Sequence, residues 1–138
     1  MRIAVVYFGT GADSSLASVA RGVAAGIESQ GYQVDIVNAD LERDRKLTMY
    51  GYIAIGTRSV SPFRGKIPNH VGIYLKSAGA VAGKKSFAFT ARTIFGSAKA
   101  LSRLMATMEH EGMFIRYSEV LRSEAEARAA GSRLKITS

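Results

Sequence analysis

The chain has 138 residues, of which 47% are hydrophobic and 22% charged, which is the profile of a single globular domain over residues 1–138. A chain of this length buries roughly two-thirds of its unfolded surface, so its core needs no disulfide or metal. With no cysteine and only two histidines, the sequence excludes disulfides, cysteine nucleophiles, and thiolate or histidine-rich metal sites. The formal net charge of +8 requires an explanation.

The apolar segments are too short to cross a bilayer or to form a secretory signal. The longest uncharged run, Leu47–Thr57, falls short of the ~20 apolar residues that a membrane-spanning helix needs. The apolar run Ile3–Phe8 leads directly into a glycine turn, which is typical of a strand and not of a signal peptide. We therefore expect a cytoplasmic protein with no membrane span.

Short β-branched runs alternate with amphipathic segments, which predicts alternating strands and helices. The expected strands are Ile3–Phe8, Val34–Val37, Tyr52–Ile55, Lys84–Thr90 and Phe114–Val120. The expected helices are Leu16–Ile27, Val71–Ala78, a segment with the apolar face Leu101, Leu104, Met105 and Met108, and Ser123–Leu134. The polar stretch Asn38–Thr48 is expected to form a reduced helical turn, and Lys135–Ser138 to be frayed.

This alternation predicts an α/β fold, a doubly wound five-stranded parallel sheet of order 2-1-3-4-5 with helices on both faces. Within the first helix, Gly22 and Gly26 each cost ~1 kcal/mol of helix propensity. Both lie near the apolar stripe, so we expect them to bring this helix close to the sheet.

In open parallel sheets, ligands bind beyond the carboxyl ends of the strands, where the strand order reverses. Here that point lies between the first and third strands, where the loops Gly9–Ser15, Thr57–Lys66 and Ala91–Gly96 meet. The first loop joins a strand to a helix N-terminus, whose free amides and partial positive charge form an anion site. The alternative is that Asp13 or Ser14 simply caps the helix.

Four segments resemble the flavodoxin family in order and spacing. Val5–Ala17 resembles its phosphate loop, Ser/Thr-x-Thr-Gly-x-Thr, and Ile55–Val60 resembles the end of its third strand. Gly83–Phe89 resembles its Gly-Lys-Lys entry to the fourth strand, and Gly96–Leu101 the helix that follows. The resemblance spans the chain and implies a flavodoxin-like fold with flavin mononucleotide (FMN), its phosphate on the first loop and its ring between the other two.

The resemblance also implies which residues bind FMN. They are Gly9, Thr10, Gly11, Ala12, Asp13, Ser14 and Ser15 in the first loop, Thr57, Arg58, Ser59, Val60 and Phe63 in the second, and Ala91, Arg92, Phe95 and Gly96 in the third. Two positions depart from the family pattern, since Phe8 and Asp13 replace its first and last hydroxyl residues. A carboxylate about 5 Å from the phosphate would cost roughly 3 kcal/mol per charge pair at an effective dielectric near 20. Asp13 therefore points away, or binding is weak, or the flavin has been lost.

Aromatic and basic residues of the second and third loops are candidates to surround the ring. Phe63 and Phe95 are either its apolar cover or loop anchors packed on the domain. Family members are acidic around the flavin, whereas this chain places Arg58, Arg64, Lys66 and Arg92 in these loops. Positive charge there predicts a raised reduction potential and attraction of an acidic redox partner or an anionic or quinone substrate. The alternative is that the charge only maintains solubility.

These observations favour an FMN-binding redox protein that transfers electrons through a non-covalent flavin. One alternative is a small FMN-dependent quinone reductase or protoporphyrinogen-oxidase-like enzyme, and another is a flavin-free interaction domain. The carrier is favoured because no side chain is an evident acid or base. We expect His70 to be a capping or surface residue and His110 to suit a helix C-terminus. Nucleic acid is not expected, because the basic residues are scattered without a base-stacking motif.

Overall fold

The computed structural model describes residues 1–9, 14–60 and 65–137. Its strands are β1 (Arg2–Tyr7), β2 (Gln33–Asn38), β3 (Tyr52–Thr57), β4 (Lys85–Ala91) and β5 (Phe114–Leu121). Its helices are α1 (Ser14–Glu28), α2 (His70–Ser77), α3 (Ser97–His110) and α4 (Glu124–Arg133). The strands form one parallel sheet in the order β2-β1-β3-β4-β5, which confirms the predicted topology.

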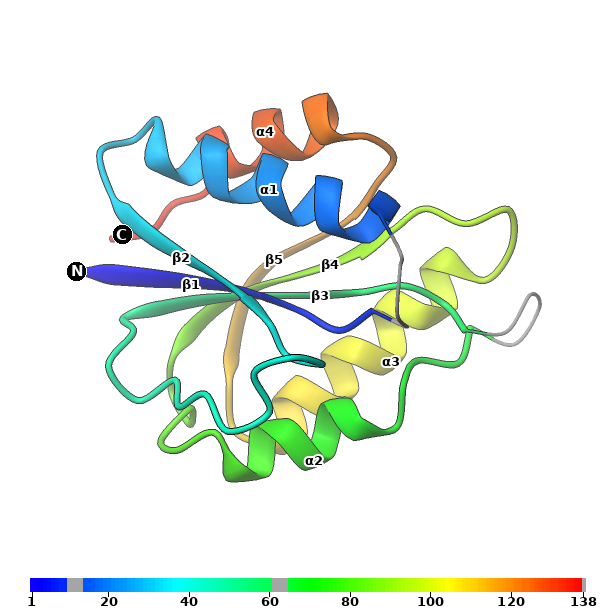
Figure 1. Cartoon of the computed structure of the whole chain (residues 1–138), viewed down its shortest axis with the longest axis horizontal. Helices are drawn as coiled ribbons and strands as arrows, with labels where there is room; N and C mark the ends of the chain where they lie inside the picture. Colours follow the sequence, from blue (N-terminus) through cyan, green and yellow to red (C-terminus); the bar gives the residue numbers. More distant parts are fainter. Residues whose placement is uncertain (10–13, 61–64, 138) are drawn as a thin grey trace.

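The sheet lies between two helical layers, with α1 and α4 on one face and α2 and α3 on the other (Figure 1). Alternate residues of a strand point to opposite faces, so a strand covered on both sides must be apolar throughout. In β1, Ile3 and Val5 are buried in the core beneath α1 and α4, whereas Ala4 and Val6 are buried in the core beneath α2 and α3. This double burial explains the continuous apolar run.

The glycines of α1 face α4, so the expectation that they bring α1 close to the sheet is wrong. A Cβ atom on Gly26 would lie 2.2 Å from the carbonyl oxygen of Arg128, and one on Gly131 would lie 2.4 Å from that of Val23. Both neighbours are backbone atoms, so the two helix backbones are in direct contact. As a result α4 packs mainly on α1 and makes few contacts with β5.

Two connecting segments complete the fold. Residues 39–50 form successive turns, and Glu42 N–H donates to the Asn38 carbonyl at 2.9 Å, which confirms the predicted single helical turn. The prediction that the C-terminal segment is frayed is wrong for its described part. Ile136 is only 2% exposed, because its side chain extends the core beneath α1 and α4 beyond the last helix.

None of the helices in the described ranges combines the length and the apolar character that a bilayer crossing requires.

Candidate functional site

The three loops singled out from the sequence leave the same edge of the sheet. In Figure 1 the start of α1, the loop after β3 and the loop after β4 all lie at the carboxyl ends of the strands. The order reverses here, since β1 pairs with β2 on one side and β3 on the other. Residues 10–13 and 61–64 lie outside the described residues, so the predictions for Thr10, Gly11, Ala12, Asp13 and Phe63 remain predictions.

Hydrogen bonds join the carboxyl ends of β1 and β3. Phe8 N–H donates to the Gly56 carbonyl at 2.9 Å, and Thr57 Oγ1 donates to the Phe8 carbonyl at 3.0 Å. The Phe8 ring is fully buried and meets His70 and Tyr74 edge-on, at 5.7 and 5.3 Å between ring centroids. Phe8, which stands at the family's first hydroxyl position, is therefore part of the core beneath α2.

The second and third loops touch each other through two glycines. Val60 N–H donates to the Lys66 carbonyl at 2.7 Å, which closes the base of the second loop. Gly96 has a φ of +84°, and a Cβ there would lie 3.1 Å from both Gly65 N and Ser59 Oγ. The sequence analysis missed Gly65, whose position within a loop gave no signal of this contact.

Hydrogen bonds within the third loop and to β5 fix its conformation. Thr93 N–H donates to Ser97 Oγ at 2.8 Å, and Thr93 Oγ1 donates to the Phe95 carbonyl at 2.7 Å. Arg92 N–H donates to the Leu121 carbonyl at 2.8 Å, which fixes the start of the loop to β5. This turn leaves Ile94 89% and Phe95 53% exposed, so the Phe95 ring is not a buried anchor. The sequence analysis did not identify Ile94.

The described part of the site is cationic. Arg58 is half-buried, and Lys66 and Arg92 are exposed. No aspartate or glutamate occurs among the described residues of the three loops. The N-terminus of α1, where Ser15 is exposed, adds a partial positive charge at the same edge. Each of these features favours an anionic ligand.

The two histidines lie outside the three loops. His70 is the first residue of α2, and its Nε2 lies 2.5 Å from Asp40 Oδ1. His110 is exposed in the last turn of α3, which confirms its predicted place at a helix C-terminus. The described residues contain no group of three or more histidine, aspartate or glutamate side chains placed to hold a metal ion.

The described residues fit a nucleotide-like ligand with an anionic end and a flat ring. Amides at the start of α1 and the Ser15 hydroxyl are donors suited to a phosphate. Val60 and Phe95 are exposed apolar side chains on the two loops that meet through Gly65 and Gly96. Such a combination of apolar cover and a few polar donors is typical of cofactor sites.

Solved structures share this architecture. Flavodoxin 1 from Bacillus cereus superimposes with a TM-score of 0.68 and 14% identity, covering 95% of this chain and 92% of that one. A flavodoxin from the domain Archaea gives a TM-score of 0.65 and 19% identity, covering 96% and 94%. This chain has the flavodoxin-like fold.

The flavodoxin-like fold also occurs as one part of longer proteins. A flavodiiron protein from Giardia intestinalis matches with a TM-score of 0.66 and 14% identity, over 96% of this chain but 35% of that one. No protein-family model matches the sequence, and no curated protein sequence matches it. The solved structures thus confirm the fold that the motifs imply, and FMN binding stays a prediction.

Proposed function

We propose that this flavodoxin-like chain binds FMN non-covalently at the carboxyl edge of its sheet and transfers electrons between redox partners. The observation that carries the proposal is the convergence of three loops at the reversal point between β1 and β3, two of them in contact through Gly65 and Gly96. When bound, FMN supplies the redox chemistry.

The chain's own residues would bind and orient the cofactor. The first turn of α1 would hold the phosphate, because a helix N-terminus carries a partial positive charge and directs backbone N–H groups towards an anion. Val60 and Phe95 would cover the ring and exclude water from it. Arg58 in the second loop and Arg92 in the third loop would supply positive charge near the ring.

The purified protein is expected to bind FMN with one-to-one stoichiometry and to show an absorption band near ~450 nm. Phe95→Ala should weaken FMN binding about tenfold, because it removes apolar cover from the ring. Ile73→Ala, which truncates an exposed side chain of α2, is the matched control and should leave the affinity unchanged. The measurement is the quenching of flavin fluorescence on titration.

A colourless protein that takes up no added FMN would contradict the proposal. In that case the flavin-free interaction domain is the better interpretation. Uptake of FMN with equal affinity in wild type and Phe95→Ala would retain the flavin but refute the role of this ring. Steady turnover of a reduced nicotinamide with a quinone would indicate an enzyme in place of a carrier.

The reduction potential of bound FMN is expected to fall in Arg58→Gln and Arg92→Gln. Positive charge stabilises the anionic reduced flavin, so its removal favours the oxidised form. Redox titration measures the potential, with Arg103→Gln, an exposed residue of α3, as the control of equal charge change. Unchanged or higher potentials in the two loop variants would refute the electrostatic role.

The surroundings of the proposed ring site also suit a partner of opposite charge. The exposed side chains of Val60, Ile94 and Phe95 offer apolar contact area, and Lys66 and Arg92 add exposed positive charge. Complementary charge raises the rate of encounter and makes that rate fall with ionic strength. The proposed partner is therefore an acidic redox protein, with a small anionic or quinone substrate as the alternative.

A further inference from the structure

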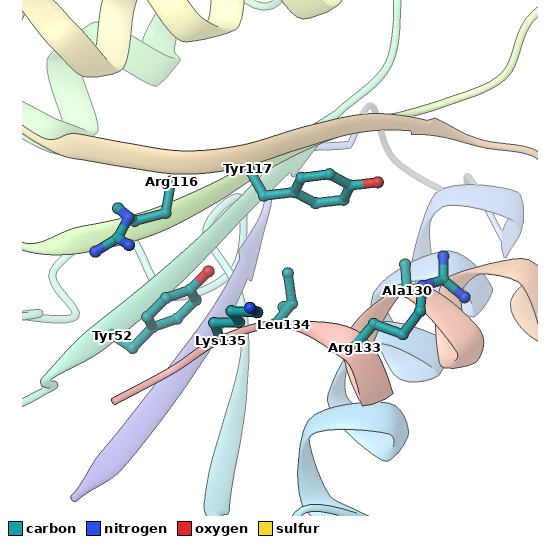
Figure 2. A pocket seen from close by; sticks show the side chains of 7 residues that line it. All are labelled: Tyr52, Arg116, Tyr117, Ala130, Arg133, Leu134 and Lys135. Atoms are coloured by element: carbon teal, nitrogen blue, oxygen red, sulfur yellow. The ribbon is translucent and has the colours of Figure 1, made fainter. Parts of the chain in front are cut away.

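A cavity of about 330 Å³ is lined by residues of β3, β5, α4 and the segment after α4 (Figure 2). Tyr52 from β3, Tyr117 from β5, Ala130 from α4 and Leu134 after it contribute to its lining. Tyr52 is the first residue of β3, and Tyr117 is level with Ala54, three residues before Thr57, so about 10 Å of strand or more separate the lining from the carboxyl edge. The cavity is therefore a separate space in the amino-terminal half of the sheet.

The cavity exists because α4 is held against α1. The close backbone contacts of Gly26 and Gly131 place α4 beside α1, and α4 makes few contacts with β5. The Tyr117 ring on β5 is consequently 46% exposed, and it stacks beside the Phe87 ring of β4 at 5.6 Å with an interplanar angle of 17°. Because α4 covers β5 incompletely, the Tyr117 ring is accessible to a ligand.

One buried donor is directed into this space. Tyr52 is only 1% exposed, and its hydroxyl points towards the region between Tyr117 and Leu134 (Figure 2). Burial raises the pKa of Tyr52, so the hydroxyl keeps its proton at neutral pH. A ligand that accepts a hydrogen bond from this hydroxyl would gain a hydrogen bond shielded from bulk water.

The rim of the cavity is cationic. Arg116, Arg133 and Lys135 all line it, and Arg133 also hydrogen-bonds the Tyr117 side chain. A carboxylate does lie nearby, since Tyr117 donates its hydroxyl to Glu119 Oε1 at 3.0 Å. Glu119 does not line the cavity, so positive charge dominates there.

We propose that this cavity binds a small planar aromatic carboxylate, independently of any flavin. Its ring would lie against Tyr117 and Leu134, and its carboxylate would accept hydrogen bonds from the Tyr52 hydroxyl and from Arg133 or Lys135. The volume lies within the range of ~300–1,000 Å³ that is usual for small-molecule sites. Charge-assisted hydrogen bonds of this kind are stronger than neutral ones, so the anion provides the selectivity.

The probe is 2-naphthoate, titrated by calorimetry against the full chain with and without added FMN. We expect it to bind, and 2-naphthamide and cyclohexanecarboxylate to bind at least tenfold more weakly, because one lacks the charge and the other the planar ring. Arg133→Gln should weaken 2-naphthoate binding about tenfold, and Tyr52→Phe several-fold. Arg128→Gln, an exposed α4 residue that does not line this cavity, should have no effect.

The result does not depend on flavin binding, because the probe should bind equally with FMN present or absent. Thermal unfolding of each variant checks that the fold is intact. Failure of wild type to bind 2-naphthoate, or equal affinity for 2-naphthamide, overturns the proposal. Equal losses in Arg133→Gln and Arg128→Gln also overturn it, since they indicate only a general effect of charge.

Discussion

Replacing Gly26 by alanine is expected to lower the free energy of unfolding by about 2 kcal/mol or more. The new methyl group would lie 2.2 Å from the Arg128 carbonyl oxygen and 2.6 Å from the Ser132 amide nitrogen, both in the backbone of α4. Neither atom can rotate away as a side chain can, so α4 must shift from α1. The gain of about 1 kcal/mol in helix propensity offsets only part of this cost.

Gly72→Ala is the matched control for this substitution. Gly72 lies within α2, and a methyl group there would meet only Thr107 Cγ2, at an ordinary contact distance of 3.6 Å. The same change should therefore stabilise the protein by about 0.5–1 kcal/mol. Urea denaturation measures both values. A gain in stability from Gly26→Ala would show that the two helix backbones do not touch.

The order and type of the elements could be predicted because local residue patterns determine them. The run Ile3–Phe8 is apolar at every position, which only a strand covered on both faces requires, and β1 is such a strand. Gly31 and Gly112 follow α1 and α3, and both have positive φ angles that other residues rarely adopt, so glycine at these positions is a local signal for a helix end. Right-handed crossovers then leave few topologies for a five-stranded parallel sheet.

What each element touches could not be predicted, because a local pattern does not specify its partner. The spacing of Gly22 and Gly26 is the same whether α1 approaches the sheet or another helix, and only the placement of α4 decides. Phe8 follows β1 directly, and the motif gave no indication that its ring is buried against α2. Gly65 and Gly96 meet across a long stretch of chain, so the site's assembly appears only in three dimensions.

Lys84 has a structural role that its motif did not reveal. The sequence analysis noted it only as part of a Gly-Lys-Lys entry to β4. In the structure its Nζ donates to three carbonyl groups of the segment before β3: Leu47 at 3.2 Å, Tyr50 at 2.6 Å, and Thr48. Burial lowers the pKa of Lys84, which marks the cost of desolvating this ammonium group. The three acceptors offset that cost.

Lys84→Met is therefore expected to lower the free energy of unfolding by about 2–3 kcal/mol. Charge-assisted hydrogen bonds stabilise a protein more than neutral ones, but the partial exposure of these three reduces their contribution. Methionine keeps the length of the apolar stem, so the loss reports the ammonium group. Lys76→Met, at an exposed position of α2, should change stability by no more than about 0.5 kcal/mol. Equal losses in the two variants would indicate that Lys84 contributes only to net charge. A loss confined to Lys84→Met would show that one side chain fixes the segment leading into β3, the strand whose other end carries Thr57 and the proposed flavin site.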